Sequence, residues 1–327
     1  MKCILSFLLS LTTLFSLSAC SIQKAASTQQ LPESSSQTEW SYTFTDSLGQ
    51  SITLNSRPET VAVLFSSYAQ IWELAGGTVS VTVGESVERG FAPEETILVD
   101  SGAGKTIDLE LLLCAQPDFI IGSADIAAQA DACRLTSQAG IPSALFQTDT
   151  FSDYLEMLNI CTQITGDTAA YARYGTEVET KIDSLLSAVD KTALPEKDIL
   201  FIRAGSQYSS TKAKRAPDNF VCTMLDELGA HNIADDAPLL LDSLSLEEIL
   251  LRDPDYIFLT TMGNREAAVS YIRDLFTQDG WRDLKAVKNG NYTFLDKELF
   301  HFKPNQNWAE AYTTLAQLLY PELNSHD

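Results

Sequence analysis

One sequence pattern occurs twice in this chain, and it constrains the fold more than any other feature. Residues 108–121 read DLELLLCAQPDFII and residues 245–258 read SLEEILLRDPDYIF. Each copy has a small polar residue, an acid two places later, an apolar helical stretch, a Pro-Asp pair and a β-rich apolar run. A helix that leads through a Pro-Asp turn into a buried strand is one step of a parallel sheet. Two such steps predict two similar α/β lobes with a ligand cleft between them.

The remaining segments fit two Rossmann-like lobes joined by one long helix. Strands and helices alternate through the first half, which predicts a mostly parallel sheet, and a hairpin over residues 40–54 precedes them. The second lobe begins at a strand over residues 199–202 and ends in a helix over residues 308–319. Between the lobes, apolar residues from Tyr171 to Val189 recur every three or four positions, as on one face of a helix. About 24 helical residues span roughly 36 Å, so this helix is expected to brace both lobes and to allow only small closing motions.

The amino-terminal segment has the pattern of an exported lipoprotein. Lys2 precedes an apolar stretch over residues 4–17 that is short for a membrane span and typical of a secretory signal. Leu17-Ser18-Ala19-Cys20 resembles a bacterial lipobox, which implies cleavage before Cys20 and acylation of its thiol, for example with palmitate. Ordinary signal cleavage at a small residue is the alternative. Acylation would attach the protein to the cell membrane through the lipid anchor alone.

Composition completes the predicted domain organisation. A segment rich in Ser, Gln and Thr follows Cys20 and cannot bury enough apolar surface to fold alone. The predicted parts are a signal peptide over residues 1–19, a lipidated cysteine and flexible tether over 20–39, an N-terminal α/β lobe over 40–166, an interlobe helix over 167–191 and a C-terminal α/β lobe over 192–327.

The charge of the chain excludes some partners. A net charge of −22 and a pI near 4.4 argue against nucleic acid, whose phosphates would be repelled, and disfavour broad contact with anionic lipid. The plain interpretation is an extracytoplasmic surface, and we expect a monomer.

Four cysteines fall in the predicted lobes, and their spacing does not define a pairing. Cys114, Cys133, Cys161 and Cys222 show no CxxC motif, so buried thiols and one disulfide both remain open. With only three histidines in the chain, a site that holds bare zinc or manganese is not expected, and no intrinsic cofactor is predicted.

Several loose motifs occur in a specific order over about residues 40–322. They are the D-x-x-G turn from Asp46 to Gly49, Arg57-Pro58, the two E-(x)6-P-D segments, LGAHNIA over 228–234 and W-x-x-L-x-A-V-x-x-G over 281–290. Together they resemble the substrate-binding proteins of ABC importers for ferric siderophores, haem and cobalamin. The resemblance implies two α/β lobes joined by a long helix, a ligand held between them, delivery to an ABC permease and no catalysis.

The same resemblance implies a role for two acids. In that family an acid on each lobe docks onto basic residues of the permease, and by position these acids are Glu110 and Glu247. Both also lie in the first turn of a predicted helix, where an acid gains about 0.3–1 kcal/mol from the helix dipole. Helix stabilisation is therefore the alternative interpretation, and the two are compatible.

Candidate ligand contacts follow from a rule about parallel sheets. Ligands of open α/β sheets lie beyond the carboxyl ends of the strands, which selects seven loops. These are Phe65–Tyr68, Gly84–Phe91, Gly122–Asp125 and Gln147–Thr150 in the first lobe, and Arg203–Arg215, Thr260–Arg265 and Asp296–Lys303 in the second.

Positive charge gathers in one of these loops. Four cations lie within 13 residues of a strongly acidic chain, together with a tyrosine, and Lys303 lies in another candidate loop. Cations at a cleft rim attract an anionic ligand, and arginine can bind its oxygens in a fork. The alternative is a solvated basic loop paired with Asp218 or Glu227. The predicted ligand-binding residues are Tyr68, Arg203, Tyr208, Lys212, Lys214, Arg215 and Lys303.

A ferric siderophore is the favoured ligand, while haem and cobalamin remain open. A ferric catecholate, a citrate-like complex or the propionates of haem would each suit a cationic cleft. His301 stands between two phenylalanines and could bind haem iron, although a packed or hydrogen-bonded histidine is the more usual reading.

Two other classes of function are weaker. An exported hydrolase would be expected to show a nucleophile elbow or a zinc-protease motif, and neither Gly-x-Ser-x-Gly nor His-Glu-x-x-His occurs. A sensor or adhesin built on the same lobes would dock onto a partner other than a permease. Residues 102–106 resemble the end of a phosphate-binding loop, but Val99 stands where its first glycine belongs.

Overall fold

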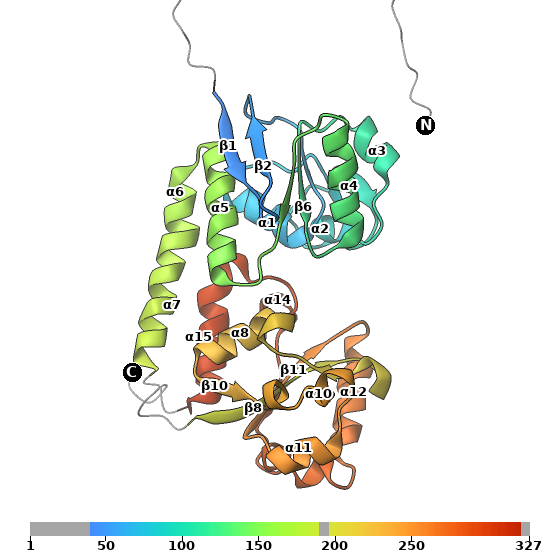
Figure 1. The fold of residues 1–327 in the computed structure, drawn as a ribbon, viewed down its shortest axis with the longest axis vertical. Helices are drawn as coiled ribbons and strands as arrows, with labels where there is room; N and C mark the ends of the chain where they lie inside the picture. Colours follow the sequence, from blue (N-terminus) through green and yellow to red (C-terminus); the bar gives the residue numbers. More distant parts are fainter. Residues whose placement is uncertain (1–39, 190–195, 322–327) are drawn as a thin grey trace, which may run out of the picture.

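The computed structural model describes residues 40–189 and 196–321. It contains two separate five-stranded sheets, one in each half of the chain (Figure 1). The predicted α/β architecture of two lobes with mostly parallel sheets is therefore confirmed. Within the described residues, no helix has the length and apolar character needed to cross a membrane. The predicted signal peptide, Cys20 and the tether lie outside the described residues.

The first lobe is built on a parallel sheet with strand order β5-β4-β3-β6-β7. Its strands alternate with helices along the chain, so each helix crosses back over the sheet. The strands are β3 (Val61–Val63), β4 (Val81–Val83), β5 (Ile97–Asp100), β6 (Phe119–Ser123) and β7 (Ser143–Phe146), and the helices are α1 (Ser66–Leu74), α2 (Gly84–Glu88), α3 (Leu109–Cys114), α4 (Ala127–Gln138) and α5 (Phe151–Thr165).

The predicted hairpin is present as antiparallel strands β1 (Tyr42–Thr45) and β2 (Ser51–Leu54). Its turn depends on Asp46, whose buried carboxylate accepts hydrogen bonds from the amides of Leu48 and Gln50. Gly49 completes the turn at a φ of 76°, a region that favours glycine. The other oxygen of Asp46 accepts the amide of Leu145 at 3.1 Å, which ties the hairpin to β7.

The second lobe has parallel strands in the order β10-β8-β11-β12, with the short β9 antiparallel beside β8. The strands are β8 (Lys197–Ala204), β9 (Lys212–Ala213), β10 (Ala230–Asn232), β11 (Tyr256–Thr261) and β12 (Tyr292–Phe294), and the helices are α8 (Phe220–Glu227), α9 (Ile233–Asp236), α10 (Leu239–Asp242), α11 (Leu246–Arg252), α12 (Arg265–Phe276), α13 (Lys285–Lys288), α14 (Lys297–Phe300) and α15 (Trp308–Leu319).

The two copies of the sequence pattern fold alike, as α3–β6 and α11–β11. In each copy the residue before the proline, Gln116 or Asp253, has a positive φ of 50° or 44°, which ends the helix in a left-handed turn. The aspartate after the proline then reaches the neighbouring strand. Asp118 accepts the amides of Glu59 and Thr60, just ahead of β3.

Asp255 repeats this role in the second lobe by accepting the amide of Asp198 in β8 at 3.1 Å. The backbone amides of Asp118 and Asp255 themselves donate to the carbonyls of Thr60 and Asp198. In both lobes the Pro-Asp pair therefore fixes the start of one central strand against the next.

The connection between the lobes is helical, but it is not one uniform α-helix. It begins at the Asp167 cap with α6 (Thr168–Tyr171), continues as a π-helical turn over Ala172–Thr176, and ends as α7 (Glu177–Ala188). The carbonyl of Tyr174, within this wider turn, accepts a hydrogen bond from the Tyr154 hydroxyl of α5 at 2.9 Å. The end of the predicted 167–191 segment lies outside the described residues.

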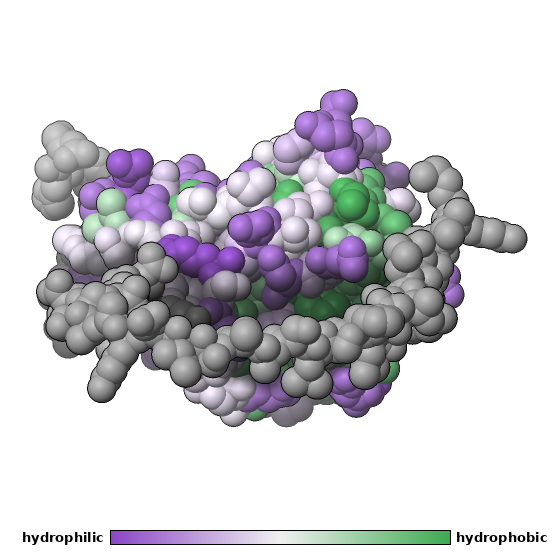
Figure 2. Space-filling model, turned by 90° about the horizontal axis from the view of Figure 1, so that it is seen from above, coloured by the Kyte–Doolittle hydropathy of each residue, from purple (hydrophilic) through white to green (hydrophobic). Residues whose placement is uncertain are grey.

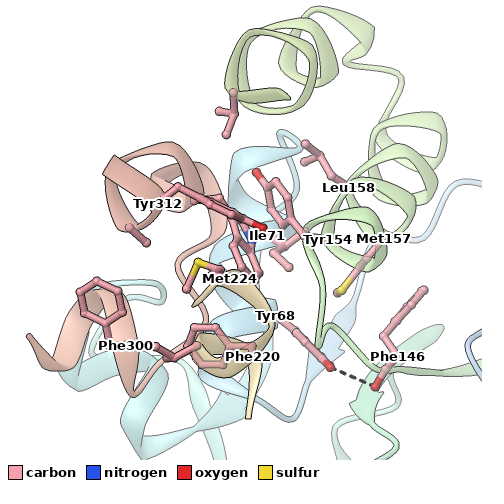
Figure 3. Close-up of a cluster of buried hydrophobic side chains, with 14 of the residues drawn as sticks. Tyr68, Ile71, Phe146, Tyr154, Met157, Leu158, Phe220, Met224, Phe300 and Tyr312 are labelled. Atoms are coloured by element: carbon pink, nitrogen blue, oxygen red, sulfur yellow. Dashed lines mark hydrogen bonds between the residues drawn. The ribbon is translucent and has the colours of Figure 1, made fainter. Parts of the chain in front are cut away.

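One apolar cluster is shared by the two lobes. It takes one face of each sheet, for example Phe119 from β6 and Phe201 from β8, while the opposite faces form separate clusters. Figure 3 shows how side chains of α1 and α5 meet those of α8 and α15. Helix α15 packs along α7 and against α8, so the carboxyl-terminal helix also joins the lobes. This shared core adds to the rigidity that the long helix alone was expected to give.

Candidate ligand site between the lobes

A cavity of about 610 Å³ lies between the lobes, at the carboxyl ends of both parallel sheets. All but one of the seven loops selected by the strand-end rule contribute to its wall, the exception being Gly122–Asp125. Its lining consists of Phe65, Glu85, Ala103, Lys105, Ile126 and Asp149 from the first lobe and Arg203, Gly205, Ser206, Ser210, Asp218, Asn219, Phe220, Thr260, Met262, Gly263, Asn264, Phe300, His301, Phe302 and Lys303 from the second.

Arg203 is the cation best placed to meet a ligand. It is the penultimate residue of β8, it lines the cavity, and its side chain is half-buried. Across residues 40–189 and 196–321, no acid lies within ion-pair distance of its guanidinium. Burial lowers the pKa of Arg203 from its ordinary value, yet a guanidinium remains charged at neutral pH. A half-buried cation without a counter-ion is suited to an anionic group of a ligand.

Lys303 also lines the cavity, but an acid of the opposite lobe already binds it. Its ammonium lies 2.8 Å from the carboxylate of Asp149 and 5.2 Å from the ring centre of Phe220. Burial acts to raise the pKa of Asp149, but the nearby charge and hydrogen bond of Lys303 outweigh it and lower that pKa. The pair is therefore ionic and crosses from one lobe to the other.

A second contact between the lobes involves Arg89, a residue that the sequence analysis did not single out. The Arg89 guanidinium donates to the hydroxyls of Ser66 and Ser67, lies 3.5 Å from Glu298 and stands 3.7 Å from the ring centre of Phe302. The cation and the ring attract each other most strongly when water is excluded. The available sequence signal was an arginine inside the predicted loop Gly84–Phe91.

Two more polar residues of the first lobe, Glu85 and Lys105, contribute to the cavity wall. Glu85 lines the cavity and accepts a hydrogen bond from the Ser66 hydroxyl at 2.5 Å. Lys105 lines it as well, as an exposed residue of the segment that resembled a phosphate-binding loop. Nearby Asp125 has a raised pKa, mainly because it is partly buried and also because Asp149 repels its charge.

His301 lines the cavity and is best described as a neutral imidazole. Burial lowers its pKa, and the nearby cations Lys297 and Arg203 lower it further. Its ring meets that of Phe302 edge-on, with 5.3 Å between the ring centres. A neutral imidazole at a cavity wall can donate or accept a hydrogen bond, or bind iron.

Five predicted ligand residues are not among those that line the cavity, so nothing in this cavity supports a role for them in ligand binding. Tyr68 is 1% exposed, and its hydroxyl donates to the carbonyl of Phe146 inside the first lobe (Figure 3). Tyr208 is half-exposed and turns its hydroxyl toward the carbonyl of Leu244, in the second lobe. The other three are Lys212, Lys214 and Arg215.

The basic segment leaves the cavity because the chain doubles back along β8. Strand β9 pairs antiparallel with the end of β8, with Lys212 opposite Arg203 and Ala213 opposite Ile202. The chain therefore runs away from the carboxyl edge of the sheet toward α8. There Arg215 forms an ion pair with Asp218 at 3.5 Å. Of the four clustered cations, only Arg203 lies in the cavity wall.

Glu110 and Glu247 lie far from the cavity, at the outer ends of the two lobes. Both side chains are exposed, in the first turns of α3 and α11 (Figure 1). Asp108 and Ser245 cap these helices through their side chains. Figure 2 looks onto the outer end of the first lobe and shows apolar surface on the side of α3. Exposed leucines accompany both acids, namely Leu111 and Leu113 on α3 and Leu250 and Leu251 on α11.

For three of the four lobe cysteines, the structure distinguishes a buried thiol from a disulfide. Cys133, Cys161 and Cys222 are buried thiols rather than disulfide partners, while Cys114 is exposed. Burial raises the pKa of Cys133 and Cys161 to about 12, so both stay protonated and unreactive at neutral pH. No group of His, Cys, Asp and Glu side chains in the described part of the chain is arranged to hold a metal ion.

The fold and the cavity define the class of two-lobed α/β proteins with a binding cavity between the lobes. Comparison with known proteins supports this class of protein. The chain matches the family model described as periplasmic binding protein over residues 61–299, and it therefore belongs to that family. Proteins of this family act outside the cytoplasm, bind small molecules and work with ABC permeases. The family resemblance predicted from the sequence is confirmed.

Several solved structures share the fold at low sequence identity. Staphylococcus aureus SirA complexed with staphyloferrin B is 16% identical with a TM-score of 0.64, covering 86% of this chain and 98% of SirA. The catecholate-siderophore binding protein VctP of Vibrio cholerae is 16% identical with a TM-score of 0.65, covering 85% and 99%. The haem-binding protein RhuT of Roseiflexus sp. RS-1 is 17% identical with a TM-score of 0.64, covering 80% and 98%. A search of curated proteins found no match.

Proposed function

We propose that this protein is a lipid-anchored solute-binding protein that captures an iron complex, a ferric siderophore foremost, and delivers it to an ABC permease without catalysing a reaction. The observation that carries the proposal is the cavity between the lobes, with Arg203 in its wall as a cation that pairs with no acid among the described residues. The solved relatives named above include binders of a siderophore and of haem, which supports iron complexes as the ligand class.

Ligand capture can be measured by tryptophan fluorescence. Trp308 packs edge-on against Phe220, with 5.7 Å between their ring centres, and Phe220 lines the cavity. Binding in the cavity is therefore expected to change the emission of Trp308. Specific capture with a Kd between micromolar and nanomolar corresponds to about 8–12 kcal/mol. The proposal fails if ferric siderophores, haem and cobalamin all leave the emission unchanged well above micromolar concentration.

Arg203→Gln tests the cation in the wall. Loss of a charge-assisted contact costs about 1.5–3 kcal/mol, so the Kd for an anionic iron complex should rise roughly 10- to 100-fold. Arg134→Gln is the matched control, because Arg134 is an exposed arginine of α4 that pairs with Asp131 outside the cavity lining. Equal affinities of the two variants would contradict a role for Arg203.

Haem is a second candidate because His301 lines the cavity as a neutral imidazole. A neutral imidazole is the form that binds haem iron. If haem is the ligand, its visible absorption in the protein should change when His301 is replaced by Ala. An unchanged haem spectrum in His301→Ala would show that this side chain does not bind the iron.

Docking onto the permease is proposed for Glu110 and Glu247. Both acids are exposed at the outer ends of the lobes beside exposed leucines, a combination that suits a charged, partly apolar partner surface. Reversing both charges to Arg should abolish uptake in cells while ligand binding stays intact. Glu156→Arg, an exposed acid of α5, is the control. Normal uptake by the double variant would contradict docking through these two acids.

The anchor is proposed to be Cys20, which lies outside the described residues. Labelling of growing cells with a palmitate analogue should mark the protein, and Cys20→Ser should abolish the label and release the protein from the membrane. Retention of the label in that variant would rule out Cys20 as the acylated residue.

A further inference from the structure

The negative and positive charges of the residues in the cavity wall balance one another. The lining contains the acids Glu85, Asp149 and Asp218 and the cations Lys105, Arg203 and Lys303. The sequence predicts a strongly cationic cleft, because the strand-end rule places the whole segment from Arg203 to Arg215 at the rim. The balanced charges of the cavity wall therefore change the net charge that we expect of the ligand.

Most of these charges already have partners. Asp149 holds Lys303 from the opposite lobe, Asp218 holds Arg215, and Glu85 accepts the Ser66 hydroxyl. Lys105 is exposed to solvent, where water and salt weaken its attraction. Of the described lining residues, Arg203 is the one half-buried cation that no acid pairs with.

Lys303 is held firmly by the groups around it. Its side chain is only 16% exposed and lies between the Asp149 carboxylate at 2.8 Å and the Phe220 ring at 5.2 Å. Asp149 is fixed in turn, because one of its oxygens accepts a hydrogen bond from the Gln147 amide at 2.6 Å. A ligand anion could reach Lys303 only by displacing this carboxylate or by lying beside it. The Asp149 side chain is 48% exposed, so water weakens the repulsion between like charges here but does not abolish it, and either arrangement is unfavourable.

We propose that Asp149 is a charge-selectivity residue of this cavity. By occupying Lys303, it leaves Arg203 to receive one anionic group of the ligand, so the cavity favours neutral and weakly charged complexes over polyanionic complexes. This inference rests on the proposed function, since it assumes that an iron complex or a related cofactor enters the cavity. It narrows the substrate class within that function.

The structure suggests a substitution that should widen the specificity. Asp149→Asn keeps the size of the side chain and an oxygen that Lys303 can donate to, but it removes one negative charge. Lys303 then becomes available to a second anionic group of the ligand. Polyanionic complexes should bind more tightly to this variant, while an uncharged complex should be little affected.

The test compares three ferric complexes by fluorescence titration of the mature chain. Ferric enterobactin is trianionic, haem carries two propionates, and ferrioxamine E is an uncharged hydroxamate complex. The natural protein should bind ferric enterobactin more weakly than the least charged of the complexes that it accepts. Asp149→Asn should tighten ferric enterobactin by about tenfold and change ferrioxamine E by less than about twofold, because electrostatic complementarity acts on the charged ligand.

A double-variant cycle separates charge selection from a structural effect of breaking the pair. In the natural background, Lys303→Gln should weaken the binding of ferric enterobactin, because it leaves the Asp149 carboxylate without its counter-ion. In the Asp149→Asn background, Lys303→Gln should abolish the gain. Asp131→Asn is the control, because Asp131 is an exposed acid of α4 paired with Arg134.

The outcomes distinguish this inference from the function on which it rests. If the natural protein binds ferric enterobactin as tightly as the uncharged complex, or if Asp149→Asn gives no gain, Asp149 is not a selectivity residue and the carrier function stands. If neither protein responds to any of the three complexes or to cobalamin, the proposed function fails and the inference fails with it.

Discussion

The two lobes share one framework and differ where the ligand is expected. In both, a short helix ends in a left-handed residue before proline, and the following aspartate holds the amide of the neighbouring strand. At the carboxyl ends of the same sheets the two lobes differ in the residues that they present. The first lobe presents two acids and the exposed Lys105, whereas the second presents Arg203, Lys303 and a single acid, Asp218. Buried strands and their turns thus set the architecture, while the loops at the other edge set the chemistry.

The largest expected effect concerns the strands that the two lobes have in common. Ile120 of β6 and Ile257 of β11 occupy matching positions in the repeated pattern, and both are fully buried. Ile120→Ala and Ile257→Ala should each lower the free energy of unfolding by about 2–5 kcal/mol, through lost burial and the cavity left behind. Urea unfolding measures both. A loss of unfolding free energy below about 1 kcal/mol in only one of the two variants would contradict the claim that the lobes share one framework.

A smaller effect is expected for the turn aspartates. Asp118→Ala and Asp255→Ala should each cost about 1–2 kcal/mol in unfolding free energy, because strand amides of the neighbour lose their acceptor. The cost should be greater for Asp118, which accepts two amides, whereas Asp255 accepts one and pairs with the exposed Lys285. Asp118→Asn, which keeps an oxygen acceptor, is the control. Equal stability of the Asn and Ala variants would contradict this role.

The sequence predicted the framework well because the framework is set by local patterns. Both Pro-Asp turns, the Asp46–Gly49 hairpin turn and the last helix, Trp308–Leu319, lie where those patterns placed them. The position of the cavity followed from the rule that ligands lie beyond the carboxyl ends of parallel strands. That rule needs only the order of strands and helices, which apolar periodicity supplies.

The individual contacts were less predictable because they depend on pairing between distant segments. No local pattern signals that the two-residue β9 turns back on β8, and this pairing removes Lys212, Lys214 and Arg215 from the cavity wall. Nor does the sequence show that Asp149 and Lys303, 154 positions apart, meet across the lobes. The sequence also gives no sign of the π-helical turn at Ala172–Thr176, where Tyr154 of another helix donates a hydrogen bond to the carbonyl of Tyr174.

The smallest expected effect concerns His231, a residue of β10 at the amino edge of the second sheet. His231 lies 2.7 Å from Asp198 and 3.2 Å from Asp236, with Glu196 nearby. The hydrogen bond to Asp198 raises the pKa of His231 above its ordinary value. The protonated form thus stabilises the fold fully below about pH 6.5, and this contribution is lost as pH rises through the raised pKa.

The contribution is at most about 0.5–1 kcal/mol, because the pair is partly exposed. Unfolding in urea at a series of pH values should show stability falling from pH 6 to 8 more steeply in the natural protein than in His231→Gln. His301→Gln is the counterpart, since burial lowers the pKa of His301 and its effect on stability has the opposite sign. Identical pH profiles for the natural protein and His231→Gln would contradict the ion pairing.

The central claim is that a ligand is held by both lobes at once, and hydrogen exchange of the backbone amides tests it most directly. Exchange would be compared with and without the iron complex that binds most tightly. We expect slower exchange on both sides of the cavity, in the segments around Glu85 and Asp149 of the first lobe and around Gly205 and His301 of the second. Slower exchange confined to one lobe, or placed outside the cavity wall, would contradict the account.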